Sequence, residues 1–123
     1  MTRFAEEFQG TAFAQLQSTF GEACKLRQVA GRTRADSGIL SAGTATDTSF
    51  IGVRRKVTRS EVAQGGGRVK VEDTVFDASA DDLGAVIPAV GDVVLAGDSY
   101  SELWRVVYTA KTSGGIWQLF ARL

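Results

Sequence analysis

Residues 102–123 read ELWRVVYTA, KTSGG and IWQLFARL in succession, and this stretch decides the fold. The first and third parts are rich in β-branched, aromatic and other apolar residues, as strands are, and KTSGG carries the glycines of a turn. We therefore expect a strand at 102–110, a turn at 111–115 and a return strand at 116–123.

The first of these strands is apolar on both sides. Leu103 and Val107 share one face, and Trp104, Val106 and Tyr108 form a nearly continuous apolar run with them. A strand of this kind is typical of a sheet that is covered on both faces. We therefore expect protein to pack against both faces of the strand.

Short apolar runs recur upstream at intervals of roughly 10 residues, a spacing typical of small all-β domains. The expected strands are 22–30, 50–62, 68–76 and 93–95, and 50–62 and 68–76 form a hairpin with a flexible tip at Gly65–Gly67. In the first strand, Ala23, Leu26 and Val29 are the expected inward residues. The fold class is therefore mainly β: a small antiparallel β-barrel or sandwich of about six strands, with an N-terminal α-helix and a long mobile loop.

Residues 3–20 carry the pattern of an amphipathic helix. Its apolar stripe recurs at four-residue steps and consists of Phe4, Phe8, Ala12, Leu16 and Phe20, widened by Ala5 and Phe13. One interpretation is that the stripe packs against the sheet. The other is that the helix docks a partner and leaves some of its rings exposed in the free monomer.

The 123 residues are expected to form a single domain, with the helix at about 3–20, a long loop at about 31–49 and a β meander at about 50–123. The loop is rich in Gly, Ser and Thr and is longer than connections in compact domains usually are. We expect it to contact neighbouring subunits through Arg32, Arg34, Ile39 and Leu40.

Composition argues against an enzyme. The chain has no histidine and one cysteine, Cys24, which excludes His-based zinc sites, His-dependent triads and an internal disulfide. No lysine is placed by the sequence beside a particular serine, and no phosphate loop surrounds the glycines at 65–67. We expect no catalytic residue, no metal, no cofactor and no membrane-spanning segment.

Charge is divided unevenly along the chain, although the net charge is zero. Residues 1–70 carry eleven basic and six acidic residues, and residues 71–123 carry three basic and eight acidic residues. One interpretation is a solvated surface with salt bridges inside the monomer. A second is a bipolar protomer that meets its neighbours head to tail, as in a ring, through an acidic interface at Asp81, Asp82 and Asp98. A third is a basic hairpin that faces DNA phosphates or an acidic partner through Arg54, Arg55, Lys56 and Arg59.

A C-terminal stretch of about a third of the chain resembles a known family in the order and spacing of its residues. The matching residues are Leu83, Ile87–Val94, Tyr100, Trp104–Val107, Ser113–Gly115 and Trp117–Leu119. Their pattern is similar to that of the lambda-type phage head–tail joining proteins, which act in head closure or as head–tail connectors. The Ser/Thr-rich loop after Gly31 and the Gly65–Gly67 tip depart from this pattern.

The resemblance implies a structural virion protein of the phage neck, made in the bacterial cytoplasm. It implies a ring of copies, six in number, with a portal or adaptor ring on one side and a tail terminator or tail tube protein on the other. Double-stranded DNA would pass through the channel with non-specific contacts.

Two alternatives stay open. Within the same class, the chain is a tail terminator or another tail-completion ring protein. In a different class, it is a small β-barrel that binds single-stranded nucleic acid by stacking bases on Trp104, Tyr108, Trp117 and Phe120.

Overall fold

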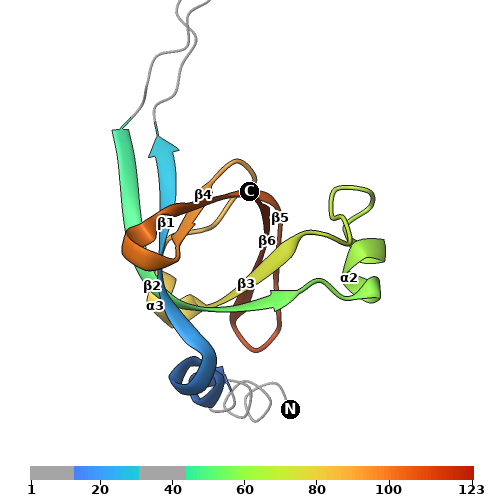
Figure 1. Cartoon of the computed structure of the whole chain (residues 1–123), viewed down its shortest axis with the longest axis horizontal. Helices are drawn as coiled ribbons and strands as arrows, with labels where there is room; N and C mark the ends of the chain where they lie inside the picture. Colours follow the sequence, from blue (N-terminus) through green and yellow to red (C-terminus); the bar gives the residue numbers. More distant parts are fainter. Residues whose placement is uncertain (1–12, 31–43) are drawn as a thin grey trace, which may run out of the picture.

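A computed structural model describes residues 13–30 and 44–123, and it is mainly β, as the sequence predicts. Residues 13–20 are helical, and a closed six-stranded antiparallel barrel follows (Figure 1). The elements are β1 (Gly21–Ala30), β2 (Thr44–Lys56), α2 (Arg59–Gln64), β3 (Thr74–Ser79), α3 (Ala80–Leu83), β4 (Val93–Ala96), the 3₁₀ turn η1 (Asp98–Tyr100), β5 (Glu102–Lys111) and β6 (Ile116–Arg122).

The strands are ordered β1-β2-β3-β6-β5-β4 around the barrel, and β4 pairs back with β1. Closure leaves the strands few free edges, which protects a small sheet from pairing with other chains. Only Lys25–Arg27 of β1 pair with β4, and only Val53–Lys56 of β2 pair with β3. The far ends of β1 and β2 therefore continue beyond the barrel as a two-stranded ribbon (Figure 1).

The expected loop at 31–49 is wrong in its last part. Residues 44–49 belong to β2, where they pair with Lys25–Ala30 of β1. The threonines of this segment are β-branched and suit a strand, although the segment lacks the apolar alternation that marks one. Residues 31–43, and with them Arg32, Arg34, Ile39 and Leu40, lie outside the described residues.

Side chains that alternate inward along the strands fill the barrel, and they are joined by Leu83 from α3. The fully buried members include Cys24, Leu26, Phe50, Phe76, Ala78, Val94, Ala96, Val106, Leu119 and Ala121. In β1 the inward residues are Cys24 and Leu26, whereas Ala23 and Val29 are exposed. The expected inward set is wrong at Ala23 and Val29 because the strand keeps a strict two-residue period from Cys24 onward.

A β-bulge in β5 changes which side chains face the core. The register of β5 against β6 shifts between Val106 and Tyr108, so Tyr108 joins Phe120 on the outer side instead of following Val106 inward. Such an extra residue interrupts the alternation of the strand. The apolar run in the sequence does not predict this change of side. The expectation that both faces are covered also fails at Leu103, which is 58% exposed.

Residues 57–73 leave the barrel between β2 and β3, and we call this segment the excursion. The expected pairing of 50–62 with 68–76 is confirmed in part, because β2 and β3 are antiparallel neighbours. The expected strand is wrong at 57–62 and at 68–72, and Gly65–Gly67 lie in the turn that follows α2. A capping box starts α2 instead: the Thr58 hydroxyl accepts from the Glu61 amide, and the Glu61 carboxylate accepts from the Thr58 amide.

The excursion covers a second hydrophobic cluster on the outside of the barrel. Val69, Val75 and Phe120 are its buried members, and Val62 and Tyr108 pack against them. The rings of Tyr108 and Phe120 meet edge to face at 5.5 Å between centroids. The excursion is therefore packed onto β3, β5 and β6 through a core of its own.

The N-terminal helix packs through one ring and leaves another in solvent. Phe13 is buried, whereas Leu16 is 45% and Phe20 67% exposed. The packing interpretation of the apolar stripe is therefore wrong for Leu16 and Phe20, and Phe4, Phe8 and Ala12 lie outside the described residues. Within residues 13–30 and 44–123, no helix has the length and hydropathy to cross a membrane.

Candidate functional site: a basic excursion and an acidic depression

Charged surface is the most distinctive chemical feature of the described residues. No group of three metal-ligating carboxylates or thiols occurs among residues 13–30 and 44–123. Burial raises the pKa of the Cys24 thiol to about 12, so the group stays protonated and inert. The exposed charged side chains form the candidate site.

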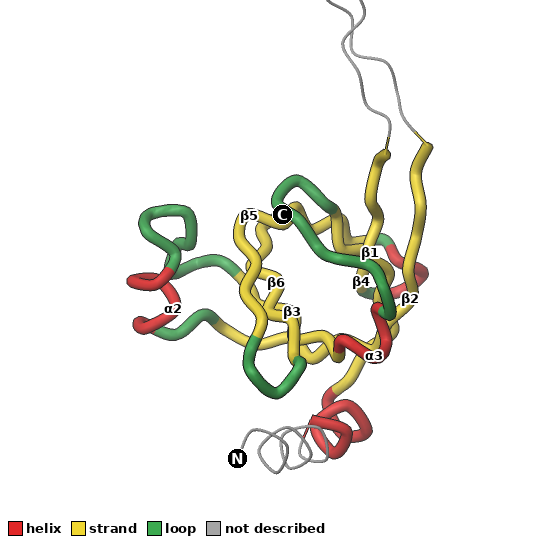
Figure 2. The backbone as a smooth tube through the Cα atoms, turned by 180° about the vertical axis from the view of Figure 1, so that it is seen from behind, coloured by secondary structure: helices red, strands yellow, loops and turns green. Residues whose placement is uncertain are grey.

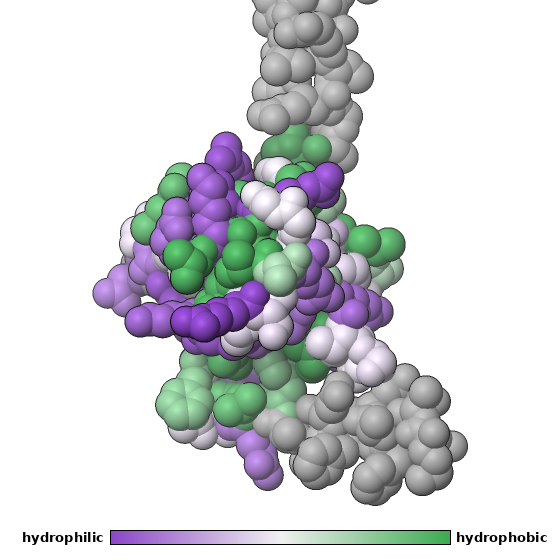
Figure 3. Space-filling model, turned by 90° about the vertical axis from the view of Figure 1, so that its right-hand side faces the viewer, coloured by the Kyte–Doolittle hydropathy of each residue, from purple (hydrophilic) through white to green (hydrophobic). Residues whose placement is uncertain are grey.

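The excursion and its root carry four of the eight exposed cations among residues 13–30 and 44–123. Its cations are Lys56 at its root and Arg59, Arg68 and Lys70 along it, and all four side chains are exposed. The excursion has one exposed carboxylate, that of Glu72. Figure 3 looks onto this side of the molecule, where strongly hydrophilic side chains surround a group of hydrophobic ones. Val71 of the excursion is 74% exposed.

Arg55 anchors the root of the excursion to the barrel. Its Nη1 and Nη2 donate to the two carboxylate oxygens of Glu61 at 2.7 and 2.6 Å, and its Nε donates to Asp77 at 2.8 Å. The bond from Arg55 lowers the pKa of Glu61, whereas burial raises the pKa of Asp77. With two carboxylates bound, the guanidinium has no free charge to offer a phosphate.

Arg122 anchors the C-terminal end of the excursion to the barrel. Its Nε and Nη2 donate to the buried Asp73 at 2.9 and 2.8 Å, and Nη2 also donates to the carbonyl of Arg68 at 3.1 Å. Burial acts to raise the pKa of Asp73, but the bonds from Arg122 and the Lys70 amide outweigh it, so that this pKa is lowered. The excursion is thus fastened at both ends by charged hydrogen bonds.

Arg54 is exposed at one end of the barrel, but its charge is paired within the monomer. It donates to Glu22 at 2.7 Å and to Glu102 at 2.9 Å, and its guanidinium lies over the rings of Phe76 and Trp104. These two ion pairs and the four of Arg27, Arg55 and Arg122 with their partners show salt bridges inside the monomer. Of the four expected DNA- or partner-facing residues, only Lys56 and Arg59 carry charge free of an ion pair within the described chain.

The acidic residues lie on the other flank of the barrel. Asp81 and Asp82 are exposed on α3, and Asp98 is exposed on η1. Asp82 accepts hydrogen bonds from Gln17 Nε2 at 3.1 Å and from the Ile51 amide at 3.3 Å, which are neutral donors. Figures 1 and 2 place α3 and α2 on opposite sides of the barrel, with η1 (orange in Figure 1) on the side of α3.

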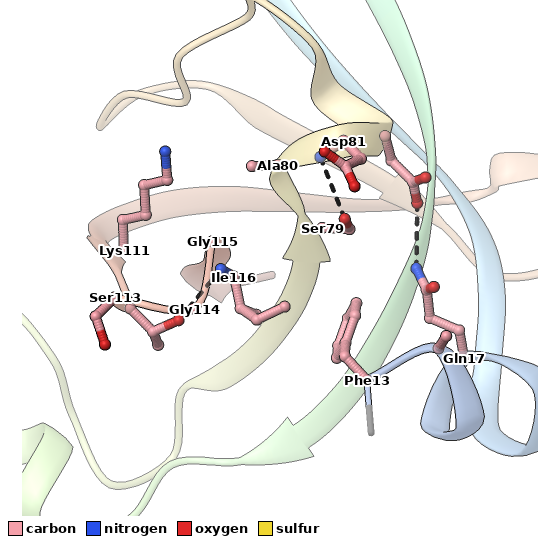
Figure 4. Close-up of a pocket in the computed structure, with 13 residues that line it drawn as sticks. Phe13, Gln17, Ser79, Ala80, Asp81, Lys111, Ser113, Gly114, Gly115 and Ile116 are labelled. Carbon is pink, nitrogen blue, oxygen red and sulfur yellow. Dashed lines mark hydrogen bonds between the residues drawn. The ribbon is translucent and has the colours of Figure 1, made fainter. Parts of the chain in front are cut away.

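A depression of about 1040 Å³ lies beside α3 (Figure 4). Its walls are helix 13–20, the start of α3 and the turn between β5 and β6, and its lining includes Phe13, Asp81, Asp82 and Ser113. Lys111 stands on the rim, with its ammonium 5.4 Å from the centroid of the Trp117 ring. The depression combines an apolar ring with two carboxylates, and we call it the acidic depression.

The aromatic residues considered for base stacking are engaged in packing. Phe120 is fully buried and has no face to offer a base. Trp104 and Trp117 are half-buried against the barrel core, and Tyr108 is half-buried against Phe120. Binding of single-stranded nucleic acid stays a prediction of the sequence.

The sequence places the basic residues Arg68 and Lys70 on a strand of the hairpin, whereas the structure places them in the excursion, outside any strand. The signal was present: Thr58 and Glu61 stand at capping-box spacing and predict a helix start at this point. Phe13 was assigned to the apolar stripe, but its place in the wall of a depression depends on the β5–β6 turn, about 100 residues away in the chain.

No model of a known protein family matches this chain, and no curated protein is significantly similar to it in sequence. Among solved structures, the fold is similar to the solution structure of protein SF1141 from Shigella flexneri 2a, with a TM-score of 0.57. The superposition covers 82% of this chain and 89% of that one, at 9% sequence identity. At this identity the likeness shows the fold, and the chain shares the architecture of that small β protein.

Proposed function

We propose that this protein is a structural component of a phage neck, which joins the capsid side to the tail as a ring of copies around the DNA channel. The observation that carries the proposal is the pairing of a rigid barrel with two charged surfaces of opposite sign on opposite flanks. Surfaces so placed cannot neutralise each other within one molecule, and they suit head-to-tail association of identical subunits.

The resemblance of the C-terminal stretch to head–tail joining proteins gives the proposal its biological setting. The residues of that resemblance form β4, β5, β6 and the loop before β4, so they make up one continuous side of the barrel. A small barrel with charged surfaces and with no metal cluster among the described residues fits a part that works by contact. In this setting the ring binds a portal or adaptor ring on one side and a tail protein on the other.

The test is deletion of the gene from the viral genome that carries it, followed by electron microscopy of the particles. We expect DNA-filled or leaking heads and separate tails, and we expect the purified protein to restore joining when it is added to such an extract. Normal tailed particles in the deletion strain would show that the proposal is wrong. Protein found on isolated tails, and absent from tailless heads, would identify a tail terminator instead.

A further inference from the structure

We infer that the excursion of one copy seats in the acidic depression of the next copy, so that the chain associates head to tail through these two surfaces. The inference deepens the proposed ring, on which it rests, by naming the residues of its interface. The partner that occupies the acidic depression is a second copy of this chain. Charge, shape and rigidity each support this choice.

Charge complementarity is the first reason. The excursion offers Arg59, Arg68 and Lys70 as exposed cations. The depression offers the carboxylates of Asp81 and Asp82, and neither forms an ion pair within the described chain. Lys111 on the rim is the one opposing charge among the lining residues, and its ammonium lies over the Trp117 ring. Opposite surfaces of this kind steer association and fix its register.

Shape is the second reason. The excursion protrudes from the barrel in Figures 1 and 2, and α2 forms its outermost helix. The depression, at about 1040 Å³, is at the upper end of the roughly 300–1,000 Å³ of ligand clefts. The exposed Val71 adds an apolar side chain to the charged surface of the excursion.

Rigidity is the third reason. The Arg55–Glu61 and Arg122–Asp73 pairs hold the excursion in place before any partner arrives. A surface that is already ordered loses less conformational entropy on binding than a loop that must fold first. The two surfaces point away from each other, so the contact is heterologous and builds a ring when its rotation closes.

Cysteine cross-linking tests the contact directly. Ser60 of α2 and Ser113 of the β5–β6 turn are exposed, and the native Cys24 is buried and unreactive. A mixture of the Ser60→Cys and Ser113→Cys variants, treated with a short bismaleimide, should give covalent dimers, and the double variant should give a ladder. The matched control pairs Ser60→Cys with Thr46→Cys, an exposed position on the ribbon formed by the far ends of β1 and β2, and should give no ladder.

A charge swap tests the electrostatic part. We expect Arg59→Glu and Asp81→Lys each to weaken self-association by roughly tenfold or more in sedimentation velocity, and a mixture of the two variants to restore it. Thr46→Glu, a control that adds a negative charge on the ribbon of β1 and β2, should leave association unchanged.

Two results overturn the inference: no cross-link between the Ser60→Cys and Ser113→Cys variants at high protein concentration, or no recovery of association when the Arg59→Glu and Asp81→Lys proteins are mixed. A third is a full ladder from the double cysteine variant that also carries Arg59→Glu, if that protein has lost affinity for double-stranded DNA. The last result would assign the excursion to the DNA. If the cross-links form but virions assemble normally without the protein, the interface stands and the neck function fails.

Discussion

Arg54 and Trp104 share one acceptor: Oε1 of Glu102 receives Arg54 Nη1 at 2.9 Å and Trp104 Nε1 at 2.9 Å. The guanidinium also lies over the indole ring, 5.3 Å from its centroid. Glu102 begins β5 and Arg54 lies near the end of β2, so the cluster closes one end of the barrel. Arg54 looks like a surface charge in the sequence, but in the structure it joins β2 to β5 and helps to close this end of the barrel.

Arg54→Met should destabilise the protein by about 1–3 kcal/mol, because it leaves Glu22 and Glu102 facing each other without their shared cation and removes a cation–π contact. Denaturant unfolding followed by tryptophan fluorescence measures the loss. Arg105→Met, an exposed arginine on the outside of β5, is the control and should change stability by less than about 0.5 kcal/mol. Equal losses in the two variants would contradict a closing role for Arg54.

Gly97→Ala should destabilise the protein more than Gly84→Ala does. Both glycines have positive φ, 78° and 62°, so alanine is strained at each by roughly 1 kcal/mol. At Gly97 the added methyl group would also overlap the carboxylate of Glu102, whereas the space at Gly84 is open. Thermal unfolding of both variants checks this. The extra loss should vanish in the Arg54→Met background, where the position of Glu102 no longer matters.

Glu61→Gln should loosen the excursion without unfolding the barrel. The amide keeps part of the capping box but loses the charged bonds to Arg55, which are worth about 1.5–3 kcal/mol. Hydrogen exchange of the α2 amides should therefore become roughly tenfold faster or more, while exchange in β6 stays as it was. Glu72→Gln removes an exposed carboxylate from the same excursion and should leave both rates unchanged.

Acid should release the excursion. The folded-state pKa values of Glu61 and Asp73 lie below their ordinary values of 4.5 and 3.8. Their ionised forms therefore stabilise the fold fully above those ordinary values, and this stability is lost as pH falls through the lowered pKa values. Asp77 acts in the opposite sense, because burial raises its pKa and its contribution is largest when it is protonated at low pH.

The melting temperature should accordingly fall as the pH drops below about 5. Asp73→Asn should flatten this part of the profile, and Asp77→Asn should steepen it, because the first removes a carboxylate with a lowered pKa and the second removes one with a raised pKa. A profile that is the same in all three proteins would show that these groups do not set the acid response.

Cys24 should resist thiol reagents in the native protein. Its side chain is 1% exposed and its pKa is about 12, so access and thiolate fraction are both small. Reaction with a maleimide at pH 7 should be slow when the protein is folded and complete within minutes in denaturant, as measured by intact mass. Rapid reaction in the folded state would show that the barrel opens at β1.

Local patterns were enough to predict β4, β5, β6 and the turn between the last two, because their apolar runs and glycines carry the information within a few residues. The bulge at Val106–Tyr108 carries no such local mark. Tyr108 faces the outside of the barrel, where Val62 and Val69 of the excursion belong to the cluster that covers it. A period-two pattern alone therefore does not predict the side on which this ring lies.

The candidate site could likewise be predicted from the sequence only in part. Arg54, Arg55, Lys56 and Arg59 form one basic run in the sequence, but the barrel separates them. Arg54 is bound by Glu22 and Glu102, which are 32 and 48 positions away in the chain, and Arg55 is bound by Glu61 and Asp77. No spacing rule connects such distant partners, so their neutralisation was beyond a reading of the sequence.

The sequence by itself determined the fold class, the absence of histidine chemistry and the division of charge along the chain, because composition and short-range periodicity carry these properties. The tertiary structure decided which charges are free to bind a partner. Barrel closure brings acids from β1, β3 and β5 against two of the arginines and leaves the cations of the excursion exposed. The physical reason is that strand pairing joins residues distant in the chain, and the ion pairs it creates at close range outweigh the local order of charges.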